Sequence, residues 1–147
     1  MYEIDLSTLL LIGIDEKTTK VVDFNGEYII KECSKNIVNY SCKFFGSSLI
    51  ERGNITKRLI NVSNKAPIFI EETKNMIFFP LRSTREKVNV WISFNNLESY
   101  QQDGCKTLLK FKNQHELLVD FSYYMVDNQM TRCMMLDYMA KKRRESL

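Results

Sequence analysis

The chain has 147 residues, of which 44% are hydrophobic and 12% aromatic, and its formal net charge is +3 at pH 7. This composition excludes an intrinsically disordered chain and predicts one domain, residues 1–147, with a core of its own. The sequence has neither the apolar run of about 20 residues that spans a membrane nor the basic start and cleavage site of a signal peptide. We therefore expect a cytoplasmic protein with no membrane partner.

Hairpins dominate the expected secondary structure. The strands 9–14 and 19–24 come first, and Asn25-Gly26 then predicts a hairpin with a type I′ turn between 21–24 and 27–30. The later strands, all rich in β-branched and aromatic residues, are a hairpin of 67–70 with 76–79, a strand 88–93 that carries the single Trp91, and a hairpin of 108–112 with 116–121.

Two helices are predicted among these strands. Ser34 is expected to cap a short central helix over 35–45, with Gly46 as its left-handed stop. A C-terminal helix begins after Ser122 and ends in the basic run 141–144, whose cations suit the negative end of the helix dipole. Its five methionines fit either core packing or an adaptable partner surface. The fold class predicted is α+β, with a mainly antiparallel sheet built from hairpins.

The sequence offers no constellation typical of an enzyme or a metal site. Its four cysteines, Cys33, Cys42, Cys105 and Cys133, include no Cys-x-x-Cys pair, so we expect reduced and mostly buried thiols. The single histidine, His115, lies at a predicted hairpin turn, and neither a Gly-x-Ser-x-Gly nor a nucleotide-binding motif is present. We predict that the protein is not an enzyme and needs no cofactor or metal.

Charge is distributed unevenly along the chain. Residues 35–87 carry ten basic and four acidic side chains, a net charge of +6, whereas residues 1–34 carry −4. A basic middle segment predicts a surface for a polyanion such as nucleic acid, and an ordinary solvated surface is the alternative. The candidate contacts to DNA phosphates are the basic and hydroxyl side chains of this segment. They are Lys43, Arg52, Lys57, Arg58, Lys65, Arg82, Arg85 and Lys87, with Ser47, Ser48, Ser83 and Thr84 as neutral donors.

Two aromatic pairs and two glycines lie in the same segment. Phe44-Phe45 and Phe78-Phe79 suggest base stacking, but we expect one member of each pair in the core and one at the surface, with most of their area in packing. Gly46 and Gly53 are small enough to let a nucleic-acid backbone approach closely.

Four motifs follow one another in a fixed order. They read Ser-Cys-Lys-Phe-Phe-Gly-Ser-Ser (41–48), Asn-Lys-Ala-Pro-Ile (64–68), Ile-Phe-Phe-Pro-Leu-Arg-Ser-Thr-Arg (77–85) and Trp-Ile-Ser (91–93). As a set they resemble the competence transcription factors of Gram-positive bacteria, the ComK family. The resemblance implies a transcriptional activator of competence (DNA uptake) genes. It also implies recognition of AT-rich double-stranded DNA, mainly through the minor groove.

The resemblance suggests roles for particular residues. Because the narrow minor groove of A-tracts attracts arginine, Arg82 and Arg85 are the expected groove residues, with Lys43 and Lys65 on phosphates. The family also implies a homodimer or higher homo-oligomer on DNA, and a Clp-protease adaptor that acts on its C-terminal region. This chain is shorter than typical members, and Lys65-Ala66-Pro67 has one proline where they more often have two. The alternatives are a protein-interaction module that modulates a full-length member and, third, an RNA-binding module.

Overall fold

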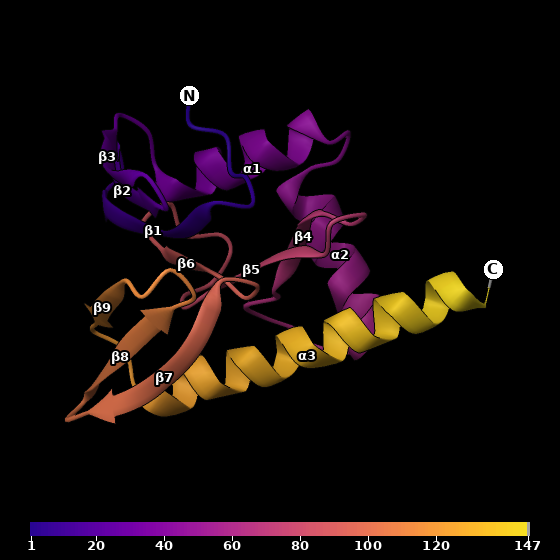
Figure 1. Cartoon of the computed structure of the whole chain (residues 1–147). Helices are drawn as coiled ribbons and strands as arrows, with labels where there is room; N and C mark the ends of the chain where they lie inside the picture. The colour runs from indigo at the N-terminus through magenta and orange to yellow at the C-terminus, as the bar shows by residue number, and fades with distance from the viewer. Residues whose placement is uncertain (147) are drawn as a thin grey trace.

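The computed structural model describes residues 1–146, which form two antiparallel sheets and three helices (Figure 1). The elements are β1 (Thr8–Asp15), β2 (Thr18–Asp23), β3 (Gly26–Ile30), α1 (Ser34–Phe44), α2 (Leu49–Ile60), β4 (Ile68–Glu71), β5 (Met76–Pro80), β6 (Val90–Ser93), β7 (Leu97–Asp103), β8 (Lys106–Phe111), β9 (Glu116–Val119) and α3 (Tyr123–Glu145). The larger sheet has the order β3-β2-β1-β6-β5-β4, and the smaller has β7-β8-β9. The predicted α+β class is confirmed.

The six-stranded sheet is covered on both faces. In Figure 1, α1 lies above it, and α3 lies below it with the small sheet. Successive side chains of a strand point to opposite faces. Thus Leu10 and Phe79 belong to the core between the sheet and α3, while Leu11 and Phe78 belong to the core between the sheet and α1.

The coverage of both sheet faces determines which members of the two aromatic pairs are buried. Phe78 and Phe79 are both fully buried, so the expectation of one surface member is wrong for this pair. It is confirmed for the other pair, because Phe44 is exposed and Phe45 packs against the core under α1.

The predicted hairpins are present, but the first turn differs from the prediction. Phe24 and Asn25 form the turn between the paired residues Asp23 and Gly26, and only Gly26 has a positive φ, of 148°. The Asp23 carboxylate accepts the backbone N–H groups of Asn25 and Gly26 at 2.8 and 3.2 Å. The prediction of a type I′ turn is therefore wrong, because hydrogen bonds to an aspartate side chain organise this turn instead.

Both predicted helices are present, together with one that was not predicted. Cys33, not Ser34, is the N-cap residue of α1, whereas Gly46 follows this helix with a φ of 81°, as expected of its stop. Helix α2 was not predicted. The Ser48 hydroxyl accepts the N–H of Glu51 at 3.1 Å at its start, and Asn61 ends it in the left-handed conformation. Strand β7 was not predicted either.

Three further observations concern the burial of the cysteines, metal sites and membrane-spanning helices. Three of the four cysteines are buried, as expected, and Cys105 is exposed. Within residues 1–146, no cluster of histidine, cysteine or acidic side chains has the arrangement of a metal site. None of the helices described here is both long and apolar enough to cross a membrane.

Candidate nucleic-acid interface

A groove of about 330 Å³ runs between α1, α2 and the loop 81–89 that joins β5 to β6. We call it the α1–α2 groove. It is lined by Lys35, Asn36, Asn39, Leu49, Ile50, Gly53, Asn54, Lys57, Ala66, Thr84 and Arg85. Three of these residues are cations and none is a carboxylate. The groove therefore has the charge expected of a phosphate-binding surface.

Helical periodicity explains why these side chains meet. On α2, Ile50, Gly53, Asn54 and Lys57 follow the spacing i, i+3, i+4, i+7, which places them on one face. On α1, Asn36 and Asn39 line the groove, and Lys43 continues their face into the last turn, where it is exposed.

The loop 81–89 is held by the side chain of Asn89, which is almost fully buried. Its Oδ1 accepts the backbone N–H of Arg82 at 2.9 Å, and its Nδ2 donates to the carbonyls of Arg82 and Ser83 at 3.1 and 3.0 Å. Oδ1 also accepts the N–H of Val90 at 2.8 Å. All four hydrogen-bonding positions of the amide are thus occupied, which fixes the loop.

Helix α1 and strand β1 support the same loop. The Ser34 hydroxyl, predicted as a helix cap, instead donates to the carbonyl of Lys87 at 2.8 Å and accepts the N–H of Asn89 at 3.1 Å. Gly13 donates its N–H to the Asn89 carbonyl at 2.8 Å. A side chain at Gly13 would place its Cβ 2.7 Å from the backbone nitrogen of Asn89, so only glycine fits this close approach.

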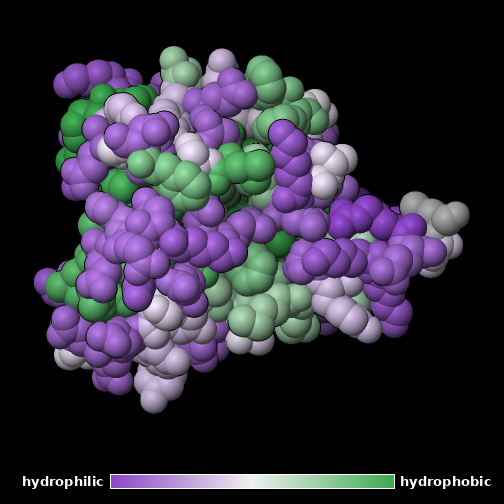
Figure 2. All heavy atoms as spheres, viewed as in Figure 1, coloured by the Kyte–Doolittle hydropathy of each residue, from purple (hydrophilic) through white to green (hydrophobic). Residues whose placement is uncertain are grey.

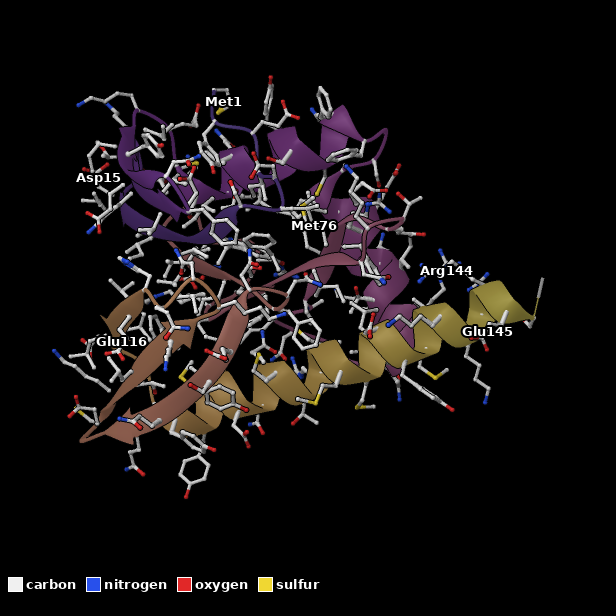
Figure 3. The ribbon with its side chains drawn as sticks, in the orientation of Figure 1. Met1, Asp15, Met76, Glu116, Arg144 and Glu145 are labelled. Atoms are coloured by element: carbon white, nitrogen blue, oxygen red, sulfur yellow. The ribbon has the colours of Figure 1, made fainter. Side chains whose placement is uncertain are left out.

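The other predicted phosphate contacts on α2 face away from this groove. Arg52 is mostly buried and pairs with Glu72 at 2.9 Å, so its charge is already compensated. Arg58 lines a second cavity, of about 250 Å³, with Arg143 and Arg144 of α3. In Figure 3, Arg144 projects from α3 on the side of α2, while Glu145 points away. The projecting end of α3 is hydrophilic in Figure 2.

Lys65 and Arg82 lie on a further surface, beside α3. The Arg82 guanidinium stands 5.4 Å from the ring centroid of Phe121, an arrangement that favours a cation–π contact. Lys65 lines a small cavity with Arg132, and the Gln129 side chain donates to the Lys65 carbonyl at 2.8 Å. The two arginines expected in the minor groove therefore diverge, and only Arg85 lines the α1–α2 groove.

The remaining predicted residues surround this groove or its loop. Thr84 lines the groove, while Ser83 is half-buried and accepts the backbone N–H of Arg85 at 3.3 Å. Lys87 is exposed at the end of the loop. Ser47 is half-buried and donates to the Glu51 carboxylate at 3.3 Å.

Sequence reasoning missed several residues of this region, among them Asn36, Asn39 and Ile50 of the groove lining. Lys35 lies in the first turn of α1, and its Nζ donates to the Arg85 carbonyl at 3.4 Å. Asn54 lines the groove from α2, and Asn89 supports the loop. The i, i+3, i+7 spacing of Ile50, Gly53 and Lys57 was visible in the sequence, but the burial of Asn89 was not.

The environment of Cys42 does not activate its thiol as a nucleophile. Burial raises the pKa of Cys42 to about 12, so this thiol is neutral near pH 7 even though Lys43 follows it. A neutral buried thiol is a poor nucleophile.

Comparison with known proteins places the chain in a family. The family model described as "ComK protein" matches residues 1–145. The chain belongs to the ComK family. It is 29% identical over 136 residues to the competence transcription factor of Bacillus subtilis (strain 168). The match covers 89% of this chain and 70% of that protein. No solved structure matches the chain.

Three of the four motifs that resemble the ComK family lie beside the groove, and the fourth, 91–93, is buried. The motif 41–48 spans the end of α1 and the cap of α2, and 64–68 supplies Ala66 to the groove. The motif 77–85 ends β5 and supplies Thr84 and Arg85, and 91–93 lies in β6. Segments far apart in the sequence thus meet at one surface.

Proposed function

We propose that this ComK-family chain is a DNA-binding transcription regulator of competence genes that recognises AT-rich promoter DNA through the minor groove. Its named relative is a transcription factor, which favours regulation over catalysis. The observation that carries the proposal is the α1–α2 groove, which has three cations and no carboxylate among its lining residues.

The groove supplies the chemistry for such a site. Lys35, Lys57 and the neighbouring Lys43 contact phosphates, and Arg85 enters the minor groove, whose negative potential is greatest in narrow A-tracts. Asn54 adds an amide of the kind that distinguishes A·T from G·C pairs there. Arg82, which lies over Phe121, contributes at most to the flanking backbone.

Fluorescence anisotropy with an A-tract duplex and a GC-rich duplex tests the proposal. We expect tighter binding to the A-tract, and we expect Arg85→Ala to reduce this preference. Arg82→Ala is the matched control, because it removes an arginine of the same loop that faces away from the groove. Equal affinities of the unmodified protein for both duplexes would contradict minor-groove recognition, and no binding to either would contradict the proposed function.

We propose further that the protein acts as a homodimer through the outer face of α3. Tyr124, Met134, Met135 and Tyr138 are exposed there, at 48–75% of their full area. Thr131 lies midway between the two tyrosines, so an antiparallel pair centred on Thr131 sets each Tyr124 beside the partner's Tyr138.

The charges of α3 favour the same antiparallel pairing. In this pairing the basic run 141–144 of one copy lies near the acidic Asp120, just before the start of α3, in the other copy. Analytical ultracentrifugation of the wild type and Met134→Glu tests this arrangement. We expect a dimer that the substitution weakens, whereas a monomeric wild type at concentrations that saturate DNA would contradict it.

A further inference from the structure

Ile50 is the most exposed large apolar side chain in residues 1–146, with 76% of its area accessible. It lies in the first turn of α2, on the wall of the α1–α2 groove. Its neighbour Leu49 is buried in the core under α1, so the chain packs one of these two aliphatic residues and leaves the other in solvent. An isoleucine this exposed contributes little to folding and gains most from burial by a ligand.

Gly53 stands one turn further along the same face. It occupies the middle of α2, where glycine is less favourable than alanine by about 1 kcal/mol. A Cβ at this position would meet no atom within 4 Å, so packing within residues 1–146 gives no reason for glycine. The missing side chain opens the groove wall directly beside Ile50, which allows a ligand to approach the helix backbone.

The surroundings of Ile50 indicate the chemistry of that ligand. Lys35, Lys57 and Arg85 favour anionic groups, while Ile50, on the same groove, favours an apolar surface. Duplex DNA presents both kinds of group, because two phosphate backbones flank the stacked bases. Proteins of the minor groove commonly insert an aliphatic side chain between two base pairs, partly unstacking them.

We propose that Ile50 is an apolar wedge that enters DNA held in the α1–α2 groove and partly unstacks one base step. The proposal rests on the DNA binding proposed above and assigns to Ile50 a role separate from that of the cations. Gly53 lets the sugar-phosphate backbone come close enough for the wedge to reach the bases.

The test uses A-tract duplexes that carry 2-aminopurine at successive positions, since this base becomes more fluorescent when it is unstacked. The wild-type chain is compared with Ile50→Ala, Ile50→Leu and the control Ile29→Ala, which shortens a residue of β3 that is 57% exposed and does not line the groove. We expect the wild type to raise the fluorescence at one step. Ile50→Ala should abolish this rise and weaken binding roughly tenfold, Ile50→Leu should retain both, and Ile29→Ala should change neither.

Lys57→Ala separates failure of the wedge from failure of the proposed function. If Lys57→Ala weakens binding while Ile50→Ala binds and unstacks like the wild type, the wedge is wrong and DNA binding by the groove stands. If the wild type binds but raises no fluorescence at any step, the wedge is also wrong. If the wild type binds no duplex, both proposals are wrong.

Discussion

Gly53→Ala should change folding and DNA binding in opposite directions. Alanine is the better residue in a helix interior, and its Cβ would meet nothing within 4 Å, so we expect the free energy of unfolding to rise by about 0.5–1 kcal/mol. For a chain of this length, that corresponds to a melting temperature higher by roughly 1.5–3 °C.

The same methyl group should weaken DNA binding, because it fills the space into which the DNA backbone is proposed to come. An extra methyl in a well-packed contact typically costs about 1–3 kcal/mol, which corresponds to an affinity lower by about five- to 150-fold. Thermal unfolding measures the first effect and fluorescence anisotropy on the A-tract duplex measures the second.

Gly13→Ala is the matched control, because the same substitution should there destabilise the fold. Its Cβ would lie 2.7 Å from the backbone nitrogen of Asn89 and 2.9 Å from its carbonyl oxygen, so strand or loop must shift. If Gly53→Ala raises the melting temperature and leaves DNA affinity unchanged, DNA does not approach α2 at this residue. If it lowers the melting temperature, the account of Gly53 as a residue kept for the ligand is refuted.

Three further predictions concern the loop, the charges and the thiols. Asn89→Asp replaces the amide group that donates to two loop carbonyls by an oxygen that cannot donate. Urea unfolding should show a free energy of unfolding lower by about 1–3 kcal/mol. Unchanged stability would mean that this network does not hold the loop. Lys57→Ala should make the slope of log affinity against log salt shallower by about 0.9, whereas Arg58→Ala, which lies outside the groove, should not; equal effects would argue against the groove as the phosphate site. Burial raises the pKa of Cys42 to about 12, above the unfolded value near 8.5, so urea unfolding should show stability that is constant below about pH 8.5 and falls as pH rises toward 12. Cys42→Ala should lose less stability than the wild type over this pH range, although not none, because burial also raises the pKa of Cys133. Identical losses in the two proteins, or a flat profile in the wild type, would contradict the assignment.

The sequence predicted the elements whose information is local. Hairpins were predicted from alternating strands and turn residues, and the stop of α1 from Gly46, because these depend on neighbouring residues. Helix α2 was missed even though Ser48 and Glu51 form a recognisable start. Its faces serve three environments, a core, an ion pair with Glu72 and the groove, so no single apolar stripe marks it.

The parts that depend on long-range packing were not predictable in this way. Strand β7 is largely polar, and it is held by pairing with β8 and by the Tyr100 hydroxyl, which donates to Asp127 of α3 at 2.7 Å. Arg82 and Arg85 point to different surfaces because of the path of the loop. That path is fixed by Asn89, which lies at the other end of the loop and hydrogen-bonds the backbone of Arg82. Basic residues close in sequence were thus assigned to one surface although the fold places them on two.

The support of the loop 81–89 explains how a charged segment can serve recognition. A loop that carried Arg85 and Lys87 without support would lose conformational entropy on binding, and that loss would reduce affinity. Here the buried Asn89 amide and the Ser34 hydroxyl fix the loop during folding, before any ligand is present. The pairing of β5 with β6 therefore also places Arg85 on the groove that Lys57 lines. For the minor-groove binding proposed above, a loop fixed in this way would hold the backbone of Arg85 in one place and so favour DNA of one groove width.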